Sequence, residues 1–130
     1  MISQKLKNIF ILSISVFIAH GLEEYFTGFY RIDPSIQNIF GRLGFNLDST
    51  FLVFQIVFWL LLIVGFILTK KLIWPKTLLF MLGLIMFYEF YHVYKAILVG
   101  GYYPGLYTAL FFPVLSYFFW KELINNFKRQ

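Results

Sequence analysis

Five ionisable residues lie inside stretches that otherwise consist of apolar residues: both histidines of the chain and three of its six acidic residues. They form two short groups, residues 20–24 with the sequence HGLEE and residues 89–92 with the sequence EFYH. An ionisable side chain at membrane depth costs roughly 2.5 to 3.5 kcal/mol on insertion scales. We therefore predict that these side chains face one another and form a site for proton chemistry, metal binding or both.

The spacing within each group favours a shared metal site. Residues three and four apart lie on one face of an α-helix, so His20, Glu23 and Glu24 project in one direction, and Glu89 and His92 do likewise. Two histidines and one glutamate with an open fourth position form a common catalytic zinc site. We predict His20, His92 and Glu24 as ligands and Glu23 or Glu89 as general base. The ion would be a divalent transition metal, with zinc as the first candidate and iron or manganese as the others.

Other uses of the same residues stay open. The glutamates and E-x-x-H pair approach the two-metal set of helical bundles, which is one glutamate short here and would need Gln55 or a water. Without a metal, Glu23 and Glu24 would repel one another in an apolar setting, so that one could hold a proton. His20 and His92 could also be axial ligands of a haem. A buried His–Glu network can also serve only to fix helix packing.

The composition is that of an integral membrane protein. Hydrophobic residues make up 60% of the 130 residues, charged residues make up 13%, and the mean hydropathy is +0.75. Four apolar runs approach the ~20 residues that cross a bilayer, namely residues 9–29, 50–69, 77–99 and 105–120. We predict an all-α fold with a single integral membrane domain over residues 1–130, built as a four-transmembrane-helix bundle. Pro113 predicts a kink in the fourth run.

Lysine and arginine predict the orientation of the bundle. Eight of the eleven basic residues lie at the two termini and in the loop between the second and third runs: Lys5, Lys7, Lys70, Lys71, Lys76, Lys121, Lys128 and Arg129. The positive-inside bias places these segments in the cytoplasm, so both termini are expected there. The net charge of +5 is thereby explained, and no nucleic acid partner is needed.

The polar side chains of the four runs lie at similar depth. At a rise of about 1.5 Å per residue, Glu23 lies roughly 21 Å above the start of the first run and His92 roughly 22 Å above the start of the third. Gln55 lies roughly 8 Å and Thr108 roughly 5 Å below the outer ends of their runs. The site is therefore expected in the outer third of the membrane.

The first outer loop carries a signal for a short helix. Asp33-Pro34 is typical of a helix start, with an N-cap residue followed by proline at the first helical position. We predict a short interfacial helix over residues 35–42. Its apolar residues would lie at the membrane surface and cover the site from above.

Three motifs occur in order along the chain: H-x-x-E-E at residues 20–24, E-x-x-H at residues 89–92 and Y-x-P-G-x-x-T at residues 102–108. The chain resembles a family of small bacterial and archaeal membrane proteins that is named for its H-x-x-E-E motif, over nearly its whole length. The resemblance implies a four-span fold, a location in the plasma membrane and a set of residues, and it implies no reaction.

We expect a metal-dependent membrane enzyme, hydrolytic rather than oxidative, whose substrate is a lipid or apolar small molecule that reaches the site sideways. Tyr103 and Thr108 are expected to position the substrate. A different class stays open, in which Glu23, Glu24 and Glu89 hold a cationic ligand against aromatic side chains of a binding or transport protein. A third is a structural subunit whose network orders the bundle. The large apolar surface would permit a homodimer.

Overall fold

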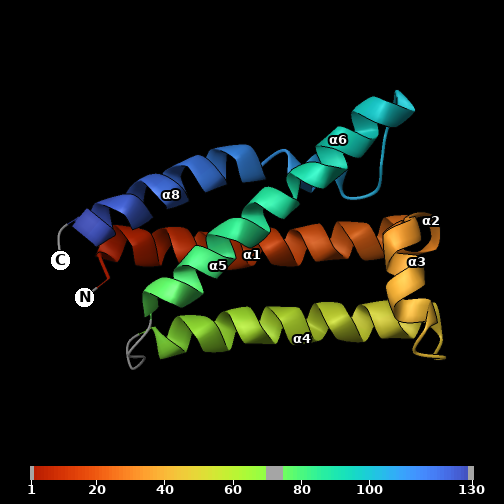
Figure 1. The fold of residues 1–130 in the computed structure, drawn as a ribbon, viewed down its shortest axis with the longest axis horizontal. Coiled ribbons are helices and arrows are strands. Elements are labelled where there is room, and N and C mark those ends of the chain that lie inside the picture. The colour runs from red at the N-terminus through yellow and green to blue at the C-terminus, as the bar shows by residue number, and fades with distance from the viewer. Residues whose placement is uncertain (1, 70–74, 129–130) are drawn as a thin grey trace.

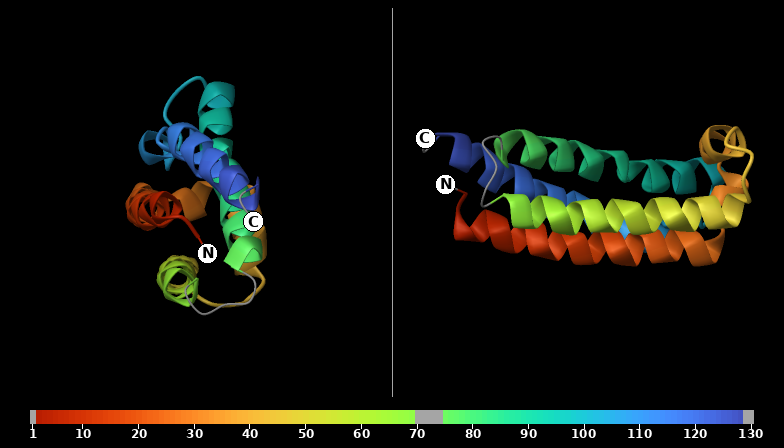
Figure 2. Two further views of the ribbon diagram at one scale, coloured as in Figure 1. Left: turned by 90° about the vertical axis from the view of Figure 1, so that its left-hand side faces the viewer. Right: turned by 90° about the horizontal axis from the view of Figure 1, so that it is seen from below.

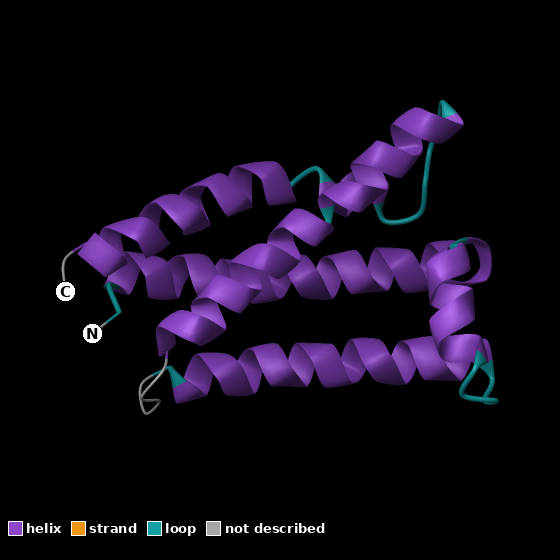
Figure 3. Ribbon diagram, viewed as in Figure 1, coloured by secondary structure: helices purple, strands orange, loops and turns teal. Residues whose placement is uncertain are grey.

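The computed structural model of this chain describes residues 2–69 and 75–128, and the elements in this part of the chain are all helices (Figure 1, Figure 3). In chain order they are α1 (Gln4–Thr27), α2 (Phe29–Ile32), α3 (Pro34–Gly41), α4 (Leu47–Leu68), α5 (Pro75–Tyr88), α6 (Phe90–Val99), α7 (Leu106–Ala109) and α8 (Phe112–Lys128). The predicted all-α fold is confirmed for these residues. Lys70, Lys71 and Arg129, which entered the predicted orientation, lie outside them.

Three helical segments are long and apolar enough to cross a membrane, judged by length and composition over the described residues: Gln4–Thr27, Leu47–Leu68 and Lys76–Val99. The fourth predicted span, residues 105–120, does not form one helix. It is divided into α7 and α8 by a break at Leu110 and Phe111. Pro113 explains the break, because proline has no N–H to donate and its ring clashes with the carbonyl four residues earlier, that of Ala109.

Helix α1 lies at the centre of the packing. It contacts α4 on one side and α8 on another, while α5 packs against α8 (Figure 1, Figure 2). Apolar side chains from these four helices form the larger core: Leu6, Phe10, Phe17, Leu62, Leu79, Leu82, Met86, Phe112, Leu115, Phe119 and Leu123. At the end of the bundle that carries both termini, called the inner end, the Ser3 amide donates to the Asn126 side chain at 2.8 Å. Lys5 pairs with Glu122 there, also at 2.8 Å.

A short helix covers the opposite, outer end. The chain leaves α1 at Gly28, whose φ of +74° is a left-handed conformation that glycine adopts without strain. The Asp33 carboxylate then accepts hydrogen bonds from the amides of Ser35 at 3.0 Å and Ile36 at 3.2 Å, and Pro34 occupies the first turn of α3. Helix α3 crosses from the end of α1 to the end of α4 (Figure 1). The predicted helix start is confirmed.

The third predicted span is interrupted at Glu89, between α5 and α6. The amide of His92 donates to the Glu89 carbonyl at 3.4 Å, three residues back instead of the usual four. Such a local tightening inside a long helix often marks a functional position or strain. It falls on one of the residues that the sequence singled out.

Candidate functional site

Four ionisable side chains meet between α1 and the α5–α6 segment, and we call them the His/Glu cluster: His20 and Glu24 from α1, Glu89 from the break, and His92 from α6. His20 Nε2 lies 2.9 Å from Glu89 Oε2 and 3.7 Å from Glu24 Oε1. His92 Nε2 lies 3.1 Å from Glu24 Oε1 and 3.7 Å from Glu89 Oε2. The prediction that the two sequence groups point inward and meet is confirmed for these four residues.

The His/Glu cluster is almost completely removed from solvent. The exposed fractions are 1% for His92, 2% for His20, 6% for Glu24 and 8% for Glu89. Two carboxylates in such an interior need compensating positive charge. Among the described residues, their ionic partners are the two imidazoles. The cluster therefore needs cations between its carboxylates and imidazoles, either protons or a metal ion.

The outward nitrogen of His92 is held by the backbone. His92 Nδ1 lies 2.6 Å from the carbonyl oxygen of Pro104. A carbonyl oxygen can only accept, so Nδ1 carries a proton. In a neutral imidazole the lone pair is then on Nε2, which faces Glu24 and Glu89. A histidine that donates from one nitrogen to a backbone carbonyl and offers the other is typical of a metal ligand.

The Nδ1 atom of His20 is also engaged by a hydrogen-bond acceptor, in this case a side-chain hydroxyl. His20 Nδ1 lies 2.8 Å from Thr108 Oγ1, and this hydroxyl donates its single proton to Glu23 Oε2 at 2.5 Å. Thr108 therefore accepts from His20 Nδ1, and the Nε2 lone pair of a neutral His20 faces the carboxylates. Both histidines thus present Nε2 to the same place.

Glu23 lies apart from the His/Glu cluster. Its carboxylate accepts from the amides of Tyr107 at 3.1 Å and Thr108 at 2.8 Å, from the Thr108 hydroxyl, and from the Tyr102 hydroxyl at 2.8 Å. These bonds satisfy free amides in the first turn of α7. Through Thr108, Glu23 orients His20. The structure thus separates the two adjacent glutamates: one enters the cluster and the other holds α7.

Helix α4 contributes one polar side chain to the cluster. Gln55 Nε2 donates to Glu24 Oε2 at 2.6 Å. This contact agrees with the prediction that Gln55 lies at a depth similar to that of the glutamates. The close approach of α4 depends on Gly21, because a Cβ at this position would lie 2.5 Å from Gln55 Oε1 and 2.9 Å from the Trp59 ring. Within the H-x-x-E-E motif, the glycine at the first intervening position therefore makes room for the residue that orients Glu24.

A second glycine packs directly on the imidazoles. Gly105 has a φ of +88°, and a Cβ there would lie 2.6 Å from His92 Nδ1 and 3.0 Å from His20 Cε1. The preceding residue is Pro104, whose carbonyl binds His92. The motif over residues 102–108 thus supplies a backbone acceptor, a close approach and the Thr108 hydroxyl to the site.

The imidazole geometry leaves no room for haem. The ring centroids of His20 and His92 lie 4.7 Å apart with an interplanar angle of 83°. Two axial ligands would instead lie on opposite faces of a porphyrin, and here the rings touch edge to face. The haem alternative is therefore wrong for this arrangement.

The ligand set that can hold a metal consists of His20, Glu89 and His92, whose ligand atoms lie within 4.8 Å of one another. His20 Nε2 is buried and makes no hydrogen bond of acceptable geometry, although Glu89 Oε2 is 2.9 Å away. An unsatisfied ring nitrogen beside a carboxylate fits a shared cation. Glu24, predicted as the third ligand, lies beside this set, and Glu89, predicted as a base, lies within it.

A cavity of about 460 Å³, called the outer cavity, opens beside the His/Glu cluster. Its polar lining residues are His20, Glu24, Gln55 and Glu89. Apolar and aromatic side chains supply most of the remainder, from α1, α3, α4, α5 and the start of α2: Phe17, Phe29, Ile36, Ile39, Phe40, Phe51, Phe54, Phe58, Ile85 and Tyr88. Because three of these residues belong to α3, the predicted covering role of the short helix is confirmed.

Asp33 is a functional candidate that sequence reasoning placed only as a helix cap. It is 1% exposed, and its Oδ2 accepts from the hydroxyls of Tyr91 and Tyr103, each at 2.7 Å. Burial alone raises the pKa of Asp33. The hydrogen bonds from the two tyrosines and from the α3 amides together lower the pKa by more than burial raises it, so the net pKa is below its ordinary value. The Tyr103 hydroxyl ties α3 to the loop that carries Pro104, and its role in positioning substrate stays a prediction.

No curated protein and no solved structure gives a significant match to this chain. A family profile described as "Protein of unknown function with HXXEE motif" matches residues 11–119. This match begins within α1, ends within α8 and includes every residue of the His/Glu cluster. The chain therefore belongs to the HXXEE-motif family.

Proposed function

We propose that this protein is a metal-dependent membrane enzyme, hydrolytic rather than oxidative, that acts on a lipid or another apolar small molecule. In this proposal α8 completes the bundle as a fourth span, and both termini lie in the cytoplasm. One observation carries the proposal: two histidines have their Nδ1 atoms engaged by Thr108 and the Pro104 carbonyl, and their Nε2 atoms face buried carboxylates.

The structure suggests a role for each member of the cluster. His20, His92 and Glu89 would hold the ion, because their ligand atoms converge. This set of two histidines and one glutamate is that of known catalytic zinc sites, with iron or manganese as alternatives. When bound, the ion supplies Lewis-acid activation of a water molecule.

Glu24 is the proposed general base. Its Oε2 is fixed by Gln55, and its side chain lines the outer cavity, where a substrate would lie. A carboxylate held in this way can take a proton from an attacking water and return it to the leaving group. Thr108 and Glu23 act through His20, since they fix its Nδ1 proton.

Metal analysis of protein purified without chelator tests the proposal. We expect about one transition-metal ion per chain, lost in His20→Ala, His92→Ala and Glu89→Ala. Glu24→Gln should retain the ion and lose activity. Glu122→Gln is the matched control, because Glu122 is also a buried carboxyl but pairs with Lys5 at the inner end. Absence of metal from the unaltered protein, or equal loss in the control, would contradict the proposal.

One observation favours a second candidate function, the binding of a cationic ligand. Glu24 and Glu89 line the outer cavity together with aromatic side chains such as Phe54 and Tyr88, and cations are attracted to aromatic faces. Metal-free protein that binds an amine, with binding lost in Glu89→Gln, would support this function. If Glu24→Gln and Glu89→Gln change only thermal stability, the network has a structural role.

A further inference from the structure

The outer cavity has a polar band between two apolar zones. His20, Glu24 and Glu89 form the band, together with Gln55. On the inner side, Phe17, Phe58 and Ile85 each lie three or four residues before or after a band residue on the same helix, which is about one turn away. On the outer side, α3 provides apolar side chains. A ligand whose polar group reaches the band therefore has hydrocarbon surroundings next to that group.

The charge of this lining excludes an anionic head group. Among the described lining residues there is no lysine or arginine, and the two carboxylates are those of Glu24 and Glu89. A divalent ion in the His/Glu cluster would only balance these two charges. A phosphate or a second carboxylate would then be buried without a cationic partner, which is strongly unfavourable.

The size and the opening of the cavity favour a single chain that enters from the side. Ile39, Phe54 and Tyr88 line the cavity and are 61%, 47% and 60% exposed. They belong to α3, α4 and α5, so the cavity reaches the surface between α4 and α5 and beneath α3. A volume of about 460 Å³ lies in the lower half of the ~300–1,000 Å³ range of small-molecule sites. This space fits one hydrocarbon chain better than the two chains of a phospholipid.

We propose that the outer cavity binds an uncharged lipid with a single hydrocarbon chain, and that the substrate is a neutral acyl ester or amide of this kind. This inference rests on the proposed hydrolytic function for its reaction, but the binding preference stands on the cavity alone. In ester hydrolysis the oxygen of water bonds to the acyl carbon and the bond to the alcohol oxygen breaks. The water proton passes to the leaving alcohol by way of Glu24.

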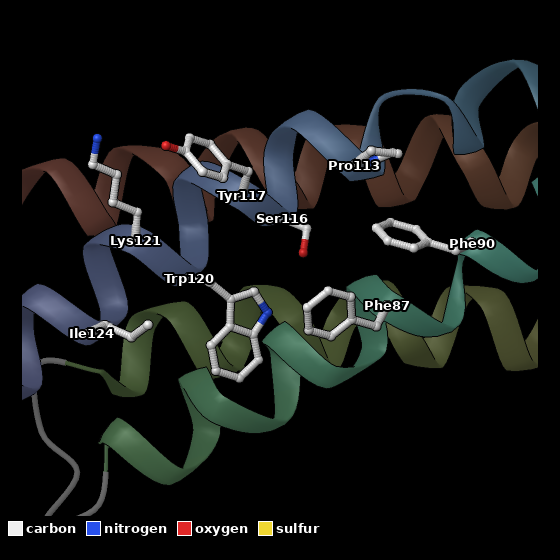
Figure 4. Close-up of a pocket in the computed structure, with 8 residues that line it drawn as sticks. All are labelled: Phe87, Phe90, Pro113, Ser116, Tyr117, Trp120, Lys121 and Ile124. Carbon is white, nitrogen blue, oxygen red and sulfur yellow. The ribbon is translucent and has the colours of Figure 1, made fainter.

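A second groove in the same molecule provides an internal comparison. It has nearly the same volume, about 450 Å³, and lies between α8 and the α5–α6 segment. Figure 4 shows Trp120 of α8 beside Phe87 of α5, with Ser116 above them and Lys121 at the rim. Most of the described residues that line this groove are apolar. One of them is basic, Lys121, and none is a carboxylate, in contrast to the outer cavity. General affinity for lipid chains would fill both sites alike.

Photo-crosslinking of the full chain in nanodiscs tests the inference. The probe is monooleoylglycerol with a photoreactive group in its chain, and the competitors are unlabelled monooleoylglycerol, dioleoylglycerol, oleoyl lysophosphatidate and oleylamine. We expect adducts on the α4 and α5 residues of the outer cavity. We also expect unlabelled monooleoylglycerol to compete about tenfold better than the other three lipids.

Two variants separate filling of the cavity from a general change in the protein. Ile39→Trp should reduce labelling several-fold, because the indole would occupy the cavity mouth. Leu43→Trp is the control, since Leu43 is an exposed apolar residue just beyond α3 and does not line the cavity. Equal competition by dioleoylglycerol or lysophosphatidate, preferential competition by oleylamine, or adducts mainly in the α5–α8 groove would overturn the inference.

The same probe distinguishes this inference from the proposed function. His92 does not line the outer cavity, so His92→Ala should lose the ion and keep the labelling. Selective labelling in a protein that holds no metal would refute the metal enzyme and leave the lipid site. A stoichiometric metal with unselective labelling would refute the lipid site alone.

Discussion

At the residue scale, the conspicuous feature is how much of the chain serves to orient two imidazoles. The Pro104 carbonyl fixes the proton of His92, and Thr108 fixes that of His20. Glu23 in turn fixes the hydroxyl of Thr108. Outer partners of this kind commonly change metal affinity by about 10- to 100-fold. The motif residues thus divide into candidate ligands and the groups that set their tautomers.

Thr108→Val should weaken metal binding by about 10-fold or more, because His20 Nδ1 loses its acceptor. Titration with a competing chelator measures the affinity. Thr50→Val is the control, since the hydroxyl of Thr50 in α4 donates only to the backbone carbonyl of the N-cap residue Asn46. Equal affinity in the two variants would show that Thr108 does not orient the ligand.

Gly105→Ala should destabilise the protein by about 1 to 3 kcal/mol, the usual cost of an overpacked site. The added Cβ would meet His92 Nδ1 at 2.6 Å, and the φ of +88° is unfavourable for alanine. Thermal unfolding in detergent measures the change. Gly101→Ala provides the comparison, because nothing lies within 4 Å of a Cβ there; a similar loss in both would contradict the packing argument.

At the element scale, α3 is held over the outer cavity by one buried carboxylate. Asp33 caps α3, and its carboxylate also accepts hydrogen bonds from the hydroxyls of Tyr91 in α6 and Tyr103 in the α6–α7 loop. Burial, and then the hydrogen bond to Asp33, raise the pKa of the Tyr103 hydroxyl, so Tyr103 stays protonated and donates. The loop that carries Tyr103 also carries Pro104, whose carbonyl binds His92. Helix α3, which covers the cavity, is therefore linked through this loop to the residue that orients His92.

Asp33→Asn should cost about 2 kcal/mol at pH 7, a typical value for a hydrogen bond to a charged group. The folded-state pKa of Asp33 lies below its ordinary value of 3.8, so the carboxylate stabilises the fold above that pH. This contribution is lost as the pH falls below about 4 toward the folded-state pKa. The difference in melting temperature between the two proteins should therefore shrink on acidification.

The control for this measurement is Asp48→Asn. Asp48 pairs with Arg31 at 2.8 Å on the exposed surface, where ion pairs contribute little. The Asp48→Asn substitution should therefore change the melting temperature only slightly at any pH. A difference between Asp33→Asn and the unaltered protein that stays constant down to pH 3 would show that the carboxylate is not the stabilising group.

At the scale of the whole molecule, both termini lie at the inner end, opposite α3 (Figure 2). The ends of α1 and α8 are tied there through Ser3 and Asn126. The larger hydrophobic core fills the same half of the bundle, whereas the His/Glu cluster lies toward the outer end. The inner half thus stabilises the fold and leaves the outer half free to keep a cavity.

Single-cysteine labelling tests the orientation, since the chain has no cysteine of its own. An impermeant maleimide should label Gly101→Cys in intact cells, and should label Gln4→Cys and Lys128→Cys only after permeabilisation. All three positions are exposed in the structure. Labelling of Lys128→Cys but not Gln4→Cys from outside would show that α8 is not a fourth span.

The sequence determined the helical fold, the short cover helix and the meeting of two histidines with two glutamates. Each of these follows from local rules: apolar runs, an Asp-Pro cap, and the three- and four-residue spacing of a helix face. The level of Gln55 and Thr108 followed as well, because helical rise is constant. Such properties depend on neighbours along the chain, so one sequence sufficed to find them.

Only the tertiary structure decided which glutamate does what. Glu23 and Glu24 are adjacent, and their different roles depend on distant residues: Glu23 meets Thr108, 85 positions later, and Glu24 meets His92 of α6. The backbone carbonyl of Pro104 and the second role of Asp33 carry no residue-type signal for the contacts they make. Long-range contacts of this kind are set by helix packing and loop path, which local patterns along a single chain do not encode.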